Sequence, residues 1–103
     1  MDELARRARL EALLAEHADA VRAYALPRIG PEAADDTVSE VFVVARRRIE
    51  RVPADALPWL LACARRVLAN QRRSARRRDA LVGRLHEERA RRRRPTGTAS
   101  APR

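Results

Sequence analysis

Apolar residues recur at every third or fourth position along most of the chain, which is the spacing that gathers them on one face of an α-helix. In the first segment, from Asp2 to Ile29, the residues with this spacing are Leu10, Leu13, Leu14, Val21 and Tyr24. We expect one helix here, because Asp2 is a suitable N-cap and because Pro27 and the Gly30-Pro31 pair are typical of a helix end.

A second segment, from about Pro31 to Arg51, repeats the pattern. Its apolar stripe consists of Val38, Val41, Phe42, Ala45 and Ile49. Acidic residues stand near its start and arginines near its end, namely Glu32, Asp35 and Asp36, and then Arg46, Arg47, Arg48 and Arg51. Both sets match a helix dipole, which favours negative charge at the N-terminus and positive charge at the C-terminus. We therefore expect a second helix.

A third helix is expected after a loop, Val52–Leu57. Pro58 suits the first turn of this helix. The positions that face the core are Leu60, Cys63, Ala64, Val67 and Leu68. The later apolar residues Leu81, Val82 and Leu85 either extend this helix or form a short fourth one, since Gly83 weakens the pattern.

Together these segments predict an all-α fold. We expect a compact domain of three to four helices over residues 1–88 and a disordered basic linker or tail over residues 89–103, whose composition is unable to bury apolar surface. No stretch approaches the ~20 apolar residues that a membrane span needs. The N-terminus lacks the apolar core of a signal peptide, so we expect a cytoplasmic protein.

Charge is divided unevenly along the chain, whose formal net charge is +9. Nine arginines and eleven acidic residues precede Trp59, whereas fourteen arginines and three acidic residues occur from Trp59 onward. This division suggests two binding surfaces of opposite sign. The basic half suits a polyanion such as nucleic acid.

Residues able to carry catalysis or to bind a metal are scattered singly. His17 and His86 have no partner at ligand spacing, and the lone Cys63 is expected to be a small core residue. Asp35 and Asp36 are adjacent, so their side chains diverge around a helix. With only three glycines, the chain has no glycine-rich phosphate loop. We therefore expect no enzyme activity, no cofactor and no metal site.

The chain resembles region 2 of the sigma-70 superfamily, in its extracytoplasmic-function (ECF) branch, along two stretches. The first is PEAADDTVSEVFVVARRR (Pro31–Arg48), where the family's pattern of acidic, apolar and polar residues is filled by Asp35, Asp36, Val38, Ser39, Glu40, Val41 and Phe42. The second is PWLLACARRVLANQRRSARRR (Pro58–Arg78), which is similar to the family's Trp-Leu run and basic helix. The resemblance covers roughly residues 8–85 and implies a sigma region 2 helical domain for residues 1–88.

The resemblance implies that the second helix docks on a coiled coil of the largest subunit of core RNA polymerase. It assigns polymerase binding to Asp35, Asp36, Ser39, Glu40 and Arg47. Asp36 and Glu40 are four residues apart, so they project from one helix face, where a basic surface would attract them. An anti-sigma protein is a further partner of the kind that the resemblance implies.

The resemblance also implies that the loop and the third helix recognise and melt the promoter minus-ten element and bind its single-stranded non-template DNA. It assigns this role to Arg51, Asp55, Trp59, Arg65, Arg66, Asn70, Arg72, Arg73, Arg76 and Arg77. A flipped base needs a pocket and hydrogen bonds to its edge, which we expect at the loop Arg51–Ala56. The arginines would neutralise phosphates. Trp59 is expected either to stack against a base or to fill the core at the start of the helix.

The chain departs from the family pattern at three positions. The family commonly has an aromatic residue at the place of Arg46, Asn at the place of Arg66 and Asp at the place of Asn70. A complete ECF sigma factor also continues into a linker and a second helix-turn-helix domain, so these 103 residues would be a shortened form or a naturally short member. Two alternatives stay open: a basic helical protein that coats nucleic acid without reading its sequence, and a sigma-like interaction module that opens no DNA.

Overall fold

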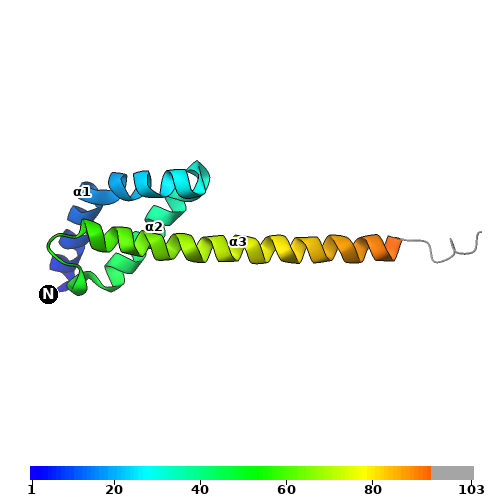
Figure 1. Cartoon of the computed structure of the whole chain (residues 1–103). Helices are drawn as coiled ribbons and strands as arrows, with labels where there is room; N and C mark the ends of the chain where they lie inside the picture. Colours follow the sequence, from blue (N-terminus) through cyan, green and yellow to red (C-terminus); the bar gives the residue numbers. More distant parts are fainter. Residues whose placement is uncertain (94–103) are drawn as a thin grey trace, which may run out of the picture. The chain divides into compact units, whose positions relative to one another are not determined.

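The computed structural model describes residues 1–93, and this part of the chain is built from helices alone (Figure 1). The elements are α1 (Glu3–Ile29), α2 (Pro31–Arg47), the short 3₁₀ helix η1 (Ile49–Arg51) and α3 (Leu57–Arg93). The prediction of an all-α fold is confirmed, and the described residues contain no strand. The chain divides into two compact units, the first being Met1–Gln71 and the second beginning at Arg72.

Helix α1 starts at its predicted N-cap and ends at Ile29, as predicted. Asp2 is the N-cap, and its Oδ1 accepts a hydrogen bond of 2.7 Å from the backbone N–H of Ala5. Pro27 was expected to help end the helix but lies inside it. Because the φ of proline is already helical, the residues after it can continue the helix. The C-cap is instead Gly30, whose N–H donates to the Leu26 carbonyl at 2.9 Å.

The corner between α1 and α2 depends on Gly30. Its φ of 88° and ψ of 164° lie in a region that residues with a side chain rarely adopt. Pro31 follows at the first position of α2, and Ala34 N–H donates to the Gly30 carbonyl at 3.0 Å. Beside the corner, Ala25 and Ala34 are fully buried against Leu68. Small side chains at both positions let the helices approach closely.

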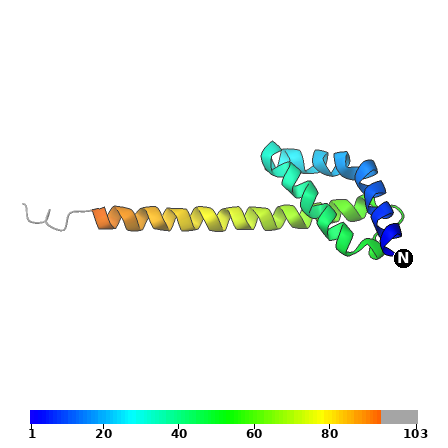
Figure 2. The ribbon, with the colours of Figure 1, turned by 180° about the vertical axis from the view of Figure 1, so that it is seen from behind.

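The main core lies in the first unit and contains side chains from α1, α2, η1 and the start of α3. Figures 1 and 2 show the ribbons of these elements from opposite sides. Its buried residues are Leu13, Val21, Val41, Phe42, Ala45, Ile49, Val52, Ala56, Leu60, Cys63, Ala64 and Val67. The apolar stripes expected on the second and third helices are therefore buried, although Val38 is only partly so. Leu14 was wrongly placed on the apolar face and is 37% exposed. It neighbours Leu13, and adjacent side chains on a helix point about 100° apart.

Thr37 is the buried polar residue of this core, and the sequence pattern gave no reason to single it out. Its side chain is 0% exposed. Its Oγ1 is within hydrogen-bond distance, 2.9 Å, of both the Ala33 carbonyl oxygen and Gln71 Oε1. Because Thr37 is on α2 and Gln71 is on α3, the hydroxyl links these two helices inside the first unit.

The helix expected up to Arg51 is divided in the structure. At the end of α2 the Arg48 N–H donates both to Val44 and to Ala45, at 3.0 and 3.2 Å, and the chain tightens into η1. Such a tightened last turn satisfies carbonyls that an α-helix leaves unpaired. Both Ile49 and Val52 are buried as a result of this path.

In the second unit, the described residues 72–93 form a single run of α3. Gly83 does not interrupt the helix, and no separate fourth helix forms. The helix also includes residues 89–93, which were assigned to the tail. Arginine is a good helix former, and Arg92 pairs with Glu88 one turn earlier at 2.7 Å. The rest of the predicted tail, residues 94–103, lies outside the described residues.

The two glycines at positions 30 and 83 give a matched test of the corner. An added Cβ would meet no atom within 4 Å at either position, so only the backbone decides the result. We expect Gly30→Ala to lower the free energy of unfolding by about 1–3 kcal/mol, because of its positive φ. Gly83→Ala should stabilise the helix by about 0.5–1 kcal/mol. Urea and thermal unfolding followed by circular dichroism measure both. Equal stability of the two variants would contradict a constrained corner.

Candidate functional site

Helix α2 presents a continuous exposed face opposite the core. Asp36, Glu40, Val43 and Arg47 follow one another at intervals of four, three and four residues, and all are exposed. We call these four residues, with the neighbouring exposed Ser39, the α2 outer face. Val43 lies in its middle and is 47% exposed. The opposite side of the helix carries Val41, Phe42 and Ala45 into the core, so the outer face is held at a fixed orientation.

Asp35 is the one residue assigned to polymerase binding that is directed elsewhere. Its Oδ1 accepts a hydrogen bond of 2.8 Å from Arg22 Nε, which comes from α1. The Asp35 side chain is 72% exposed, so this ion pair contributes at most about 1 kcal/mol. It nevertheless directs the carboxylate toward α1. The structure thus brings together Asp36, Ser39, Glu40 and Arg47, whereas Asp35, at the edge of this face, has its carboxylate paired with α1.

The loop that joins η1 to α3 is held at both ends by the core. Val52 and Ala56 are buried, whereas Pro53, Ala54 and Asp55 between them are exposed. Replacing all residues from Val52 to Ala56 with glycine and serine would therefore remove two core side chains as well as the exposed ones. The exposed part is short, and its conformation is limited by its two buried ends.

Two arginines of α1 tie down the same loop region. Arg6 Nη2 donates to Glu50 Oε1 at 2.8 Å, and Arg9 Nη2 donates to the Pro53 carbonyl oxygen at 2.9 Å. Neither arginine was among the predicted site residues. Their partners lie 44 positions away, and the acceptor for Arg9 is a backbone carbonyl. No sequence pattern marks such an acceptor.

A hollow of about 340 Å³ opens beside η1. Its lining residues are Arg6, Arg47, Arg48, Ile49, Glu50 and Arg51. It brings together Arg47 and Arg51, which the sequence assigned to two different partners. Glu50 adds one carboxylate against four arginines, so the hollow remains positive on balance.

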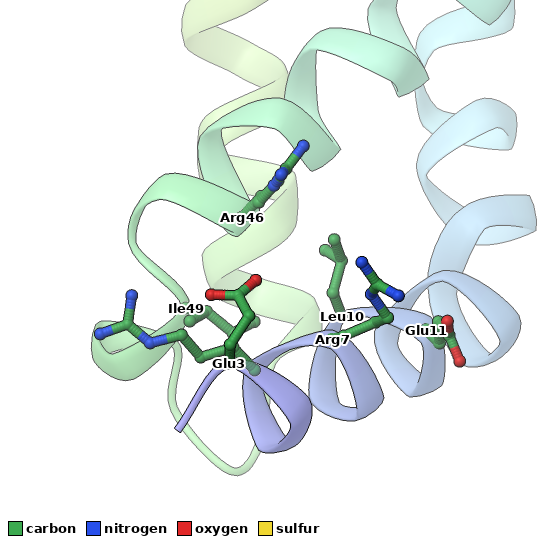
Figure 3. A pocket seen from close by; sticks show the side chains of 7 residues that line it. Glu3, Arg7, Leu10, Glu11, Arg46 and Ile49 are labelled. Carbon is green, nitrogen blue, oxygen red and sulfur yellow. The ribbon is translucent and has the colours of Figure 1, made fainter. Parts of the chain in front are cut away.

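A second hollow, of about 400 Å³, lies between the start of α1 and the end of α2 (Figure 3). It is lined by Glu3, Arg6, Arg7, Leu10, Glu11, Arg46 and Ile49. Arg46, the residue at the family's aromatic position, is one of its walls. The side chains of Glu3 and Glu11 bring carboxylates to this arginine-lined site, so positive and negative charges nearly balance here.

The predicted DNA residues on α3 differ in their surroundings. Trp59 is half-buried and packs against the main core, whereas Arg65, Arg66 and Asn70 are exposed. In the second unit, the exposed arginines form two neighbouring rows with helical spacing, Arg72 with Arg76 and Arg73 with Arg77. Arg51 and Asp55 are exposed at the loop.

Cys63 is buried on α3, in agreement with its predicted core position. Burial raises the pKa of its thiol, and the nearby Arg66 and Arg48 only partly oppose this shift. A thiol with a raised pKa is neutral at physiological pH, so Cys63 is a poor nucleophile and metal ligand. Residues 1–93 contain no group of His, Cys, Asp and Glu that could hold a metal ion. No helix in this range combines the length and the apolar character needed to cross a membrane.

Comparison with models of protein families gave no match to this chain, and comparisons with curated proteins and with solved structures gave none either.

The contact between α1 and the loop can be tested at Arg9. We expect Arg9→Ala to free the Pro53 carbonyl and to speed amide hydrogen exchange at Ala54 and Asp55 several-fold. The free energy of unfolding should fall by only about 1 kcal/mol, since the bond is at the surface. Arg7→Ala is the matched control, because Arg7 comes from the same helix and lines the neighbouring hollow. Equal exchange rates in the two variants would contradict the loop contact.

Proposed function

We propose that this chain is a sigma-70-type region 2 domain that binds core RNA polymerase and captures single-stranded promoter DNA. One observation carries the proposal. The motif that resembles the family divides into two halves in space: Val41 and Phe42 are buried, while Asp36, Ser39 and Glu40 are exposed on one face. This division is what a docking helix requires, because one half of the motif fixes the helix and the other half is available to a partner.

The polymerase contact would use the α2 outer face. Two carboxylates one turn apart attract a basic surface, and complementary charges speed association and fix its register. Val43 lies between the charged residues and offers an apolar contact. Val43 is 47% exposed before binding. Arg47, at the far end of the face, suits an acidic residue of the partner. The proposed partner surface, the coiled coil of the polymerase's largest subunit, should therefore present basic residues and an apolar position to this face.

The DNA contact would use the loop and α3. Unstacking a base costs a few kcal/mol, so the domain must hold the single strand better than the duplex. The exposed loop backbone and Asp55 offer hydrogen bonds to base edges, and the loop is held in place by Arg9. Arg65, Arg66 and the arginines from Arg72 onward would neutralise phosphates. Trp59 packs on the core, so only its exposed part is available for stacking.

Reversal of charge on the α2 outer face tests the polymerase contact. We expect Asp36→Arg with Glu40→Arg to weaken core-polymerase binding by two orders of magnitude or more, since like charges at an interface cost several kcal/mol. The melting temperature should move little, because exposed helix charges are worth tenths of a kcal/mol. Binding to single-stranded DNA should survive. Affinity is measured by biolayer interferometry with immobilised core enzyme.

A second double variant controls for net charge. Glu16→Arg with Asp19→Arg makes the same change in charge at exposed positions of α1. It should keep wild-type polymerase affinity. Wild-type affinity in the α2 variant, or equal losses in both, would rule out the α2 outer face as the docking surface. It would then favour a basic helical protein that coats nucleic acid.

Replacement of the exposed loop tests base reading. Changing Pro53, Ala54 and Asp55 to Gly-Ser-Gly, with Val52 and Ala56 kept, should preserve the fold because the core side chains remain. We expect the preference for minus-ten sequences to disappear while most affinity survives, since base contacts specify and phosphate contacts position. Fluorescence anisotropy over a salt series should give a slope of about −0.7 per phosphate neutralised. If the loop variant keeps its preference for minus-ten sequences, bases are read elsewhere in the domain. If the wild-type chain shows no such preference, an interaction module that opens no DNA is favoured.

A further inference from the structure

A third hollow, of about 540 Å³, lies in the first unit between α1 and α3. Its lining residues are Tyr24, Leu61, Ala62, Arg65, Arg66 and Ala69. Only Arg65 and Arg66 were among the predicted site residues, and the hollow is separate from the loop and from the α2 outer face. It is more open to solvent than the two hollows described above, so a ligand would lie against its surface and would not be enclosed.

The hollow results from the sizes of the side chains on α3. Ala62 and Ala69 are seven residues apart, so they lie close in angle on the helix, and their small side chains leave space between larger neighbours. Leu61 is half-buried against the core and supplies an apolar surface. Tyr24, from α1, packs against the main core and against the smaller cluster of Ala25, Ala34 and Leu68, so its ring is fixed in position.

Tyr24 is also covered by a cation. The Arg28 guanidinium carbon lies 3.8 Å from the centre of the Tyr24 ring, and Arg28 Nη1 donates to the Tyr24 carbonyl oxygen at 2.6 Å. A guanidinium held over an aromatic ring in this way adds positive potential beside the hollow. Arg65 and Arg66 line the aromatic and aliphatic surface, and Arg28 lies over the ring of its Tyr24.

An aromatic side chain and the lack of a carboxylate in its lining separate this hollow from the two described above. The hollows at η1 and at the start of α1 contain Glu50 and the pair Glu3 and Glu11, respectively. Of the described residues that line the α1–α3 hollow, none is acidic. It therefore attracts an anion. A free inorganic anion would gain nothing from Tyr24 and Leu61, whereas a nucleotide offers both a phosphate and a flat apolar base.

We propose that the α1–α3 hollow binds one nucleotide unit of single-stranded DNA, with the base against Leu61, the two alanines and the part of the Tyr24 ring that Arg28 leaves uncovered, and a phosphate on Arg65 and Arg66. The inference rests on the proposed function in taking single-stranded DNA as the ligand. It adds a base site on the body of the domain, apart from the loop. A strand held at two such sites is kept from re-pairing over a longer stretch.

The test places a carboxylate in the hollow. Ala62 is exposed on a helix, so Ala62→Glu should fold normally, and the neutral Ala62→Gln is its isosteric control. Ala12→Glu makes the same change in net charge at an exposed position of α1 outside the hollow. The probe is fluorescent single-stranded oligothymidylate, measured by anisotropy with the full chain and without polymerase. Thermal unfolding of each variant checks the fold.

We expect Ala62→Glu to weaken binding at least about fivefold more than Ala12→Glu, the lower end of what one stacked base contributes. Ala62→Gln should stay within about twofold of the wild type. In a second measurement, ultraviolet cross-linking of an oligonucleotide that carries 5-iodouracil should label Tyr24. Equal losses in Ala62→Glu and Ala12→Glu, or cross-links that avoid Tyr24, would overturn the site.

These outcomes are independent of the proposed polymerase contact. If the Ala62 variants and the cross-linking show no binding in the hollow, while the loop variant still loses its base preference, only this inference is overturned. If the hollow binds DNA but the chain has no affinity for core polymerase, the inference is supported and the proposed function is overturned.

Discussion

The burial of one side of α2 is the constraint on which the rest of the first unit depends. Val41, Phe42 and Ala45 are held between α1 and the start of α3, and the buried Thr37 hydroxyl links α2 to Gln71. Because the core fixes the rotation of the helix about its axis, Asp36, Glu40 and Val43 must point outward. The outer face is thus a consequence of packing, and its geometry does not require a partner to form.

The same core also limits the loop. Val52 and Ala56 are buried on either side of the exposed residues, and Arg9 holds the carbonyl of Pro53 from α1. A loop that is ordered before binding loses less entropy when it contacts a ligand. For a domain that must offset the cost of unstacking bases, such preorganisation is an advantage. The long first helix therefore contributes to the candidate site although it carries none of its predicted residues.

Helical periodicity was enough to predict the three helices and most of the core, since Leu60, Val67 and Phe42 follow directly from spacing. It could not predict Arg22–Asp35, Arg9–Pro53 or Thr37–Gln71, because those contacts join residues that only tertiary packing brings together. The composition of residues 89–93 favours a tail, but arginine is a good helix former, and α3 extends to Arg93. The hollow beside Tyr24 exists because Ala62 and Ala69 are small. Alanine is common throughout this chain, so its position in the sequence does not predict where a hollow forms.

The central claim is that the α2 outer face docks on core RNA polymerase, and a photo-cross-linker at its centre tests it most directly. Val43 is exposed, so p-benzoylphenylalanine should fit there without disturbing the core. On irradiation with core enzyme, the account predicts a cross-link to the largest subunit that is absent when the label replaces the exposed Ala12 on α1. A cross-link to another subunit, or none from a variant that still binds the enzyme, would contradict it.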